Sequence, residues 1–294
     1  MRTRAGLAAA SLVTLGLVGL AGGTAAGGVA AGGTVGGGMV GGGVVAGPGH
    51  GVIHVVRGIG VGVNTNQSSN WSGYNIGTGY PQVPTGTLFT SISGEWTVPT
   101  ATAHTAGQAE DSASWIGIGG GCITDDCSAT DSTLIQAGTE QDVSASGQAS
   151  YDAWWEIIPE TETEISLPVH AGDAIQVTIA ETSVPGDWSI VIDNLTTGQK
   201  FSTTTPYSSS EDTVEWIEET PLEIGTGGTG VATMPDLTTV QFTNATYNGV
   251  NPKFQAIDEM QLDNDNVIEA TPSAPGSALS NFNDCTWATS CAAP

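Results

Sequence analysis

The amino-acid sequence predicts an all-β protein, folded as a lectin-like sandwich of two antiparallel sheets. Apolar and polar residues alternate with a period of two over residues 88–98, 175–179 and 190–193. Turn-forming Gly and Pro residues, as at 119–121 and 185–187, separate these segments, and no long stretch has the apolar stripe of an amphipathic helix. Many strands punctuated by turns, in a chain of this length, favour two packed sheets.

The N-terminal segment differs chemically from the rest of the chain. Two arginines, an apolar run from Ala5 to Leu20 and then small residues follow the order of a secretory signal peptide, which we assign to residues 1–26. Residues 27–63 are almost wholly Gly, Ala and Val, with too little side-chain surface to offset backbone ordering. We expect this segment to be a disordered prosegment, followed by a β-sandwich domain over residues 64–294. The mature protein is then expected to be extracellular and free of membrane.

The expected mature domain is strongly acidic. All 30 Asp and Glu residues lie at or after Glu95, whereas the only Lys or Arg residues in that region are Lys200 and Lys253. Nucleic acids and anionic membrane surfaces are therefore excluded as partners. Crowded carboxylates should also have raised pKa values in the folded state, so we expect greater stability in acid than at neutral pH. A halophile-type surface would give the same composition.

Four cysteines fit an oxidising compartment. Cys122 and Cys127 lie close in sequence, as do Cys285 and Cys291. Three pairings are possible, and we expect the two local loops. Neither spacing is Cys-x2-Cys and the mature region has only two histidines, so we expect no metal and no other cofactor.

Acidic and aromatic residues share faces of the predicted strands. Alternation places Asp152, Trp154 and Glu156 on one face, as expected for the wall of a cleft, although an amphipathic strand would show the same pattern. Glu215 shares a face with Glu219 in a later strand. These residues, with no zinc-binding helix and no Gly-x-Ser-x-Gly turn, leave carboxylates and amides as the candidate chemistry.

Six motifs occur in one order along residues 70–217. They are Asn70-Trp71-Ser72-Gly73, Trp115-Ile116-Gly117-Ile118, Leu134-Ile135-Gln136-Ala137-Gly138, Tyr151-Asp152-Ala153-Trp154-Trp155-Glu156, Asn194-Leu195-Thr196-Thr197-Gly198 and Val214-Glu215-Trp216-Ile217. Together they resemble the glutamic peptidases, or eqolisins (peptidase family G1), known from secreted acid proteinases of fungi. The resemblance covers nearly all of the expected mature chain and implies a β-sandwich fold.

The resemblance also implies a catalytic pair. The family's catalytic glutamine matches Gln136 and its catalytic glutamate matches Glu215, which would act as a general base. The unperturbed pKa of a glutamate carboxyl lies near 4, which fits an acidic working pH. The Gln136 amide would stabilise the oxyanion. Trp71, Asp152, Trp154 and Glu156 match cleft positions and would bind substrate or support the pair.

The sequence departs from the family at two places near this pair, and one of them is Thr213-Val214, which precedes Glu215 where the family has Asn-Ala. Gly119 stands where the family often has Asp, which puts the pH profile and the specificity in question. Together with the local cysteine loops, it suggests a diverged, bacterial-type branch.

These observations predict a secreted acid endopeptidase that acts on protein or peptide substrates without a metal and is insensitive to pepstatin. Monomer is the default expectation. A glycoside hydrolase or a carbohydrate-binding module on a lectin-like sandwich is the alternative, because paired acids and tryptophans also suit sugars.

Overall fold

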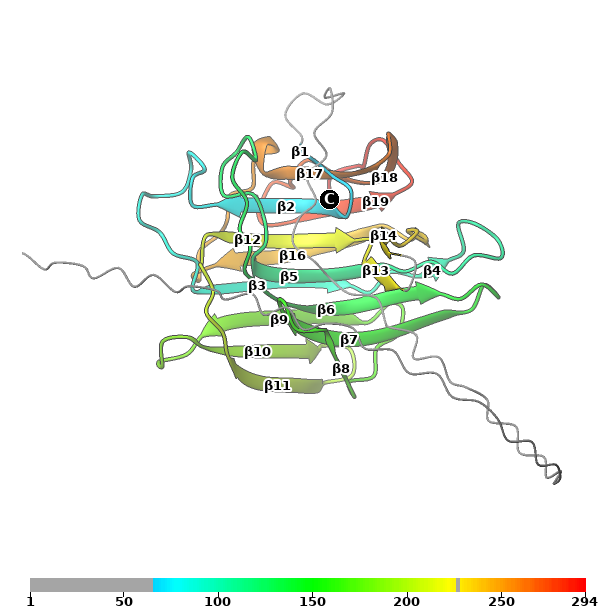
Figure 1. Ribbon diagram of the computed structural model, residues 1–294, viewed down its shortest axis with the longest axis horizontal. Helices are drawn as coiled ribbons and strands as arrows, with labels where there is room; N and C mark the ends of the chain where they lie inside the picture. Colours follow the sequence, from blue (N-terminus) through cyan, green and yellow to red (C-terminus); the bar gives the residue numbers. More distant parts are fainter. Residues whose placement is uncertain (1–65, 226–227) are drawn as a thin grey trace, which may run out of the picture. The chain divides into compact units, whose positions relative to one another are not determined.

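The structure, a computed structural model, describes residues 66–225 and 228–294, and nearly all of its regular structure is antiparallel β-strand (Figure 1). The signal peptide and prosegment expected over residues 1–63 lie outside the described residues. The strands form two layers. The first layer, in order of hydrogen bonding, consists of β8 (Thr163–Ile165), β7 (Ala149–Ile157), β6 (Leu134–Val143), β5 (Ala113–Gly119), β12 (Thr213–Glu219), β2 (Trp71–Gly77) and β17 (Glu259–Asn264).

The second layer continues from the first without a break in the hydrogen bonding. Its strands, from the junction outward, are β18 (Val267–Pro272), β19 (Phe282–Thr286), β16 (Val240–Tyr247), β3 (Ser91–Thr97), β9 (Ala174–Glu181), β10 (Asp187–Asn194) and β11 (Gln199–Pro206). The predicted sandwich is thus confirmed, with its two layers joined along one side through β17, β18 and β19.

Short elements complete the fold. They are β1 (Asn66–Ser68), which pairs in parallel with β17, the pair β4 (Ala101–Thr102) and β15 (Asp236–Leu237), the pair β13 (Leu222–Gly225) and β14 (Gly228–Val231), and the 3-10 turn η1 (Ala256–Asp258). Among the residues described, no helix is long and apolar enough to cross a membrane.

The main core lies between the layers. Two tryptophan side chains span it, and each makes a hydrogen bond to the opposite layer. The Trp216 indole on β12 donates to the carbonyl oxygen of Ser93 at 3.0 Å, and the Trp96 indole on β3 donates to the Thr139 hydroxyl at 3.1 Å. Strands β9 and β10 alternate between buried and half-buried residues, as the sequence pattern predicts. The segment predicted over 88–98 forms the shorter strand β3, and Leu88 is exposed.

Three strands of the first layer, β2, β5 and β12, are buried on both faces. One face contacts the main core. A second apolar cluster covers the other, outward face of the layer and consists of Trp71, Ala113, Trp115, Cys122, Cys127, Leu134, Trp154, Ile217 and Met260. The outward face is therefore an enclosed environment, and the polar side chains placed on it are taken out of water.

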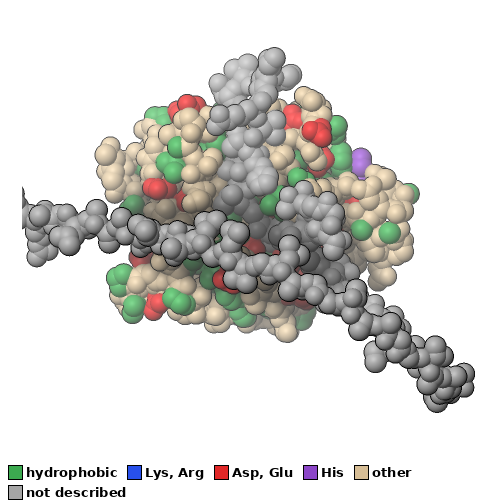
Figure 2. All heavy atoms as spheres, in the orientation of Figure 1, with side chains coloured by type: hydrophobic (Ala, Val, Ile, Leu, Met, Phe, Trp, Pro, Cys, Tyr) green, Lys and Arg blue, Asp and Glu red, His purple; other side chains and the backbone are tan. Residues whose placement is uncertain are grey.

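Both local disulfides are present, as expected. Cys122 pairs with Cys127, and Cys285 pairs with Cys291. The first disulfide closes the loop between β5 and β6 and places both of its sulfur atoms in the second cluster. Figure 2 shows acidic side chains spread over the described part of the viewed face, in agreement with the composition.

Candidate active site

Five residues form one row across the outward face of the first layer. Strand register pairs Asn75 with Glu215, Glu215 with Gly117, Gly117 with Gln136 and Gln136 with Glu156. Residues directly opposite each other in neighbouring strands project from the same face of a sheet. Gln136 and Glu215 therefore share a face, two strand spacings or about 10 Å apart at the backbone. Gly117 between them has no side chain of its own, and the Trp115 ring and the Leu134 side chain pack over it.

The Glu215 carboxyl is completely buried, and neither of its oxygens has a hydrogen-bond partner within bonding distance. Burial raises its pKa well above the ordinary value; the nearby Thr213 hydroxyl opposes this shift, and the negative charge of Asp131 adds to it. The pKa of Glu215 in this conformation is therefore higher than the unperturbed value near 4, because burial removes the water that would stabilise the carboxylate. Burial of the site therefore favours the neutral form of the Glu215 carboxyl group.

The loop after β5 covers Glu215. A Cβ atom built on Gly121 would lie 2.5 Å from Glu215 Oε1 and 1.7 Å from Asn75 Oδ1, so only glycine fits there. Asn75 fixes the loop: its Oδ1 accepts from the Cys122 amide at 2.8 Å, and its Nδ2 donates to the Cys122 carbonyl oxygen at 2.9 Å. The loop therefore packs directly against the Glu215 carboxyl group.

The same loop explains the departure at Gly119. This residue has a φ of +93°, and a Cβ atom on it would lie 2.2 Å from the carbonyl oxygen of Thr133. Any side chain here is strained and meets backbone that cannot easily yield. An aspartate at this position would require a different turn, so the absent carboxylate is a consequence of the local backbone.

Gln136 is buried and is held by its neighbour on β7. Its Nε2 donates to Glu156 Oε2 at 2.7 Å, while its Oε1 is buried without a partner. The bond to a carboxylate orients the amide, because the amide oxygen in that place would be repelled. One N–H of Gln136 is thus committed to Glu156, and the second N–H and the oxygen remain for other partners.

Two tryptophans and a glutamate line the site beside this row. The indole N–H groups of Trp71 and Trp115 donate to Glu219 at 3.1 and 2.9 Å, and their rings meet edge to face with centroids 4.9 Å apart. Trp154 is completely buried in the same cluster. Of the residues predicted from the sequence, Trp71, Trp154 and Glu156 thus share the enclosed face with Gln136 and Glu215.

Asp152 shares that face but lies farther from the pair. It is half-buried opposite Glu140, four residues along β7 from Glu156, which is about 13 Å at the usual rise per residue. The charges of Glu140, Asp111 and Asp152 accompany burial in raising the pKa of Asp142 to about 9. Asp152 therefore belongs to an acidic group at one end of the face, separate from the Gln136–Glu215 row.

Sequence reasoning did not anticipate Asn75 or Asp131. Asn75 could have been found, because alternation along residues 71–75 places it on the same face as Trp71. Asp131 lies in the loop before β6 and comes near Glu215 only through the tertiary fold, so no local pattern indicates it.

Replacing Glu219 by alanine should lower the free energy of unfolding by about 2–4 kcal/mol. Two buried indole N–H groups would lose their acceptor, and each unsatisfied donor costs about 1–3 kcal/mol. Urea unfolding at pH 4 measures the change, with the exposed Glu160→Ala as control. A loss below about 1 kcal/mol would contradict this role.

Comparison with known proteins identifies the family. The sequence matches the family described as Peptidase A4 over residues 69–279. The chain belongs to the peptidase A4 family. Members are also called eqolisins or glutamic peptidases, so the chain is a glutamic-type acid endopeptidase and the resemblance seen in its motifs is confirmed. This membership decides against the glycosidase and the carbohydrate-binding module.

Two curated relatives and one solved structure define the extent of similarity to other eqolisins. Aspergillopepsin-2 of Aspergillus niger is 30% identical over 233 residues, which cover 71% of this chain and 76% of the relative. Scytalidopepsin B of Scytalidium lignicola is 30% identical over 172 residues, or 57% of each chain. The structure of scytalido-glutamic peptidase with a transition state analog inhibitor has a TM-score of 0.56 at 23% identity and covers 74% of this chain and 98% of that one, which shows the shared fold.

Proposed function

We propose that this eqolisin is a secreted endopeptidase in which Glu215 and Gln136 form the catalytic pair. The observation that carries the proposal is the cross-strand row, in which both side chains project from the same face of the first layer on either side of Gly117. Three polar atoms in this row, both Glu215 oxygens and Gln136 Oε1, are buried without partners. Buried polar atoms are normally hydrogen-bonded, so these three atoms mark where a substrate and its attacking water would bind.

The proposed reaction begins when the loop over Glu215 opens. Water then solvates the carboxyl, its pKa falls towards the ordinary value near 4, and the carboxylate becomes available at acidic pH. Glu215 takes a proton from a water molecule as that water attacks the peptide carbonyl carbon. The free N–H of Gln136 donates to the oxyanion of the tetrahedral intermediate. Glu215 then returns its proton to the amine as the C–N bond breaks.

Glu156 has a positioning role in this mechanism. It fixes the rotation of the Gln136 amide through the 2.7 Å bond, so that the second N–H is aimed consistently. The neighbouring tryptophans and Leu134 provide an apolar wall for the substrate side chains. We also propose that residues 1–26 direct export and that residues 27–63 are removed from the mature enzyme, which acts on unfolded or loosely folded protein.

Digestion of a denatured protein between pH 3 and 7 tests the proposal. We expect cleavage that neither pepstatin nor EDTA inhibits, because the pair uses neither two aspartates nor a metal. Gln136→Ala should lower kcat/KM by about 10²- to 10³-fold, the usual effect of removing an oxyanion donor. The control is Gln148→Ala, an exposed glutamine in a turn. Full activity of Gln136→Ala, or inhibition by EDTA, would refute the mechanism.

A further inference from the structure

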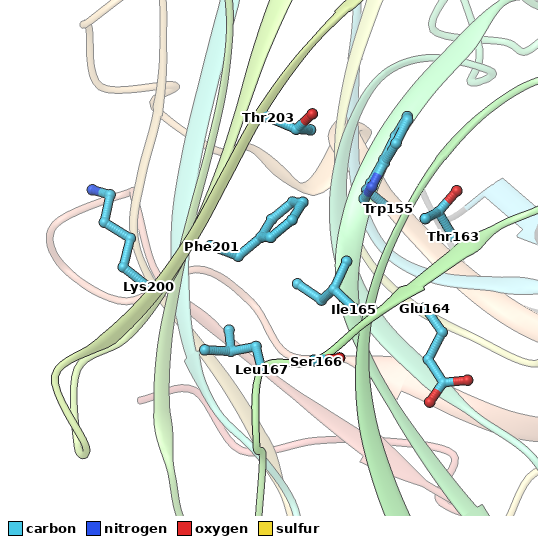
Figure 3. Close-up of a pocket in the computed structure, with 9 residues that line it drawn as sticks. All are labelled: Trp155, Thr163, Glu164, Ile165, Ser166, Leu167, Lys200, Phe201 and Thr203. Carbon is cyan, nitrogen blue, oxygen red and sulfur yellow. The ribbon is translucent and has the colours of Figure 1, made fainter.

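The sandwich is open on one side. The hydrogen-bonded path of the described strands begins at β11 and ends at β8, so these two strands have unpaired edges, whereas β17, β18 and β19 join the layers elsewhere. A cavity of about 530 Å³ lies between the two open edges (Figure 3). Its lining comes from β7, β8 and the segment after β8 in the first layer, and from β11 in the second.

The walls of this cavity are formed mainly by apolar side chains that remain partly exposed to solvent. Phe201 of β11 and Ile165 of β8 point towards each other, and Trp155 of β7 lies beside them (Figure 3). All three side chains are only partly buried, although each packs against the main core. Binding of an apolar ligand to a surface of this kind is favourable, because it removes apolar side chains from water.

The edges of the cavity carry hydroxyl side chains. Thr203 lies opposite the buried Ile190 and Thr163 opposite Trp155, so both occupy inward-facing positions of their strands. Together with Ser166, they give the lining three hydroxyl groups that can donate or accept a hydrogen bond.

The cavity is uncharged. Lys200 and Glu164 belong to its lining residues, but both side chains point away from it (Figure 3). Lys200 is also engaged by Asp193, with Nζ and Oδ2 3.1 Å apart. An ionised ligand would therefore lose its hydration without gaining a counter-charge.

We propose that this cavity is a binding site for a small uncharged molecule with an apolar body and one hydroxyl group, such as a long-chain or aromatic alcohol. Its volume lies within the range of about 300–1,000 Å³ that is usual for small-molecule sites. The site lies on the face of β7 opposite Trp154 and Glu156. Occupation of the cavity is thus independent of the Gln136–Glu215 row.

Titration with the uncharged dye Nile red, followed by displacement, tests this site. We expect saturable binding of one dye per chain, displacement by 1-decanol and no displacement by ionised decanoate at pH 7. Thr203→Trp should weaken dye binding at least about tenfold, because it fills the cavity with an indole. Ser202→Trp is the matched control, since it adds the same group on the exposed face of the same strand and should leave binding unchanged within about twofold.

Two further variants complete the experiment. Ile165→Trp fills the cavity from the opposite wall and replaces Thr203→Trp if that variant does not fold. Glu215→Gln should bind the dye as the wild type does, because it alters only the other face of the layer. Absence of saturable binding, retained binding in the folded cavity-filling variant, displacement by decanoate equal to that by decanol, or loss of binding in Glu215→Gln would each overturn the proposal.

Discussion

Glu215→Gln should abolish peptide hydrolysis and leave the protein at least as stable as the wild type. Glutamine has nearly the same shape but cannot take a proton from water, so kcat/KM should fall by about 10³-fold or more. In the folded protein, however, Glu215 is a buried acid whose oxygens lack partners. Replacing it by a neutral amide removes a group that resists ionisation but stabilises nothing nearby.

The stability difference between Glu215→Gln and the wild type should depend on pH. The folded-state pKa of Glu215 is raised by burial, so its contribution is fully present in acid and is lost as the pH rises. Glu215→Gln should therefore match the wild type in thermal melting at pH 3 and exceed it at pH 6 to 7. Activity and stability should move in opposite directions, as expected when a catalytic group is held in an unfavourable environment.

Glu218 provides a matched control on the same strand. It lies three residues along β12 with its side chain on the opposite face, towards the main core. Glu218→Gln makes the same chemical change and should retain peptidase activity. Residual activity of Glu215→Gln within about tenfold of the wild type, or equal loss in both variants, would remove Glu215 from the mechanism.

The faces of the strands could be predicted from the sequence because they depend on local alternation. The row Asp152, Trp154 and Glu156 projects from one face of β7, and Trp155 packs against the main core on the other, as the pattern implies. The two local disulfides followed from short spacings in the same way.

Features that depend on tertiary closure could not be predicted. The cover over Glu215 arises where Gly121 packs against side chains of two strands distant in sequence, and with it comes the raised pKa of Glu215. The strand alternation likewise gives no indication that the two layers are joined, nor that their free edges enclose a cavity. Alternation specifies a face but not what covers it.

A buried pair of acids between the layers should make the protein lose stability as the pH rises from about 4 to 8. Burial raises the pKa of Glu218 to about 8, and the charge of Asp284 adds to the shift while the hydroxyls of Ser114 and Ser112 oppose it. Burial raises the pKa of Asp284 to about 7, against hydrogen bonds from the Ser72 hydroxyl and the Cys285 backbone. One oxygen of each acid is buried without a partner. The folded protein is therefore most stable when both acids are in their neutral form.

Stability should fall with rising pH because folding is linked to protonation of these two acids. Both folded-state pKa values exceed the values near 4 of the unfolded chain, so the contribution of the pair is complete below about pH 4. Between that pH and the folded-state values, each group lowers the free energy of unfolding by up to about 1.4 kcal/mol per pH unit. Urea unfolding should thus show a steep decline for the wild type between pH 4.5 and 7.5.

Glu218→Gln should flatten that decline by about 2–4 kcal/mol across the same range, because the amide can still accept from Ser114 but never ionises. Asp284→Asn should act in the same direction, and the double variant should fall short of the sum, because Glu218 and Asp284 also repel each other when both are charged. Glu160→Gln removes one exposed carboxylate and separates this local effect from the general repulsion of an acidic surface. If Glu160→Gln and Glu218→Gln have equal slopes, the acid preference comes from the surface and not from the pair between the layers.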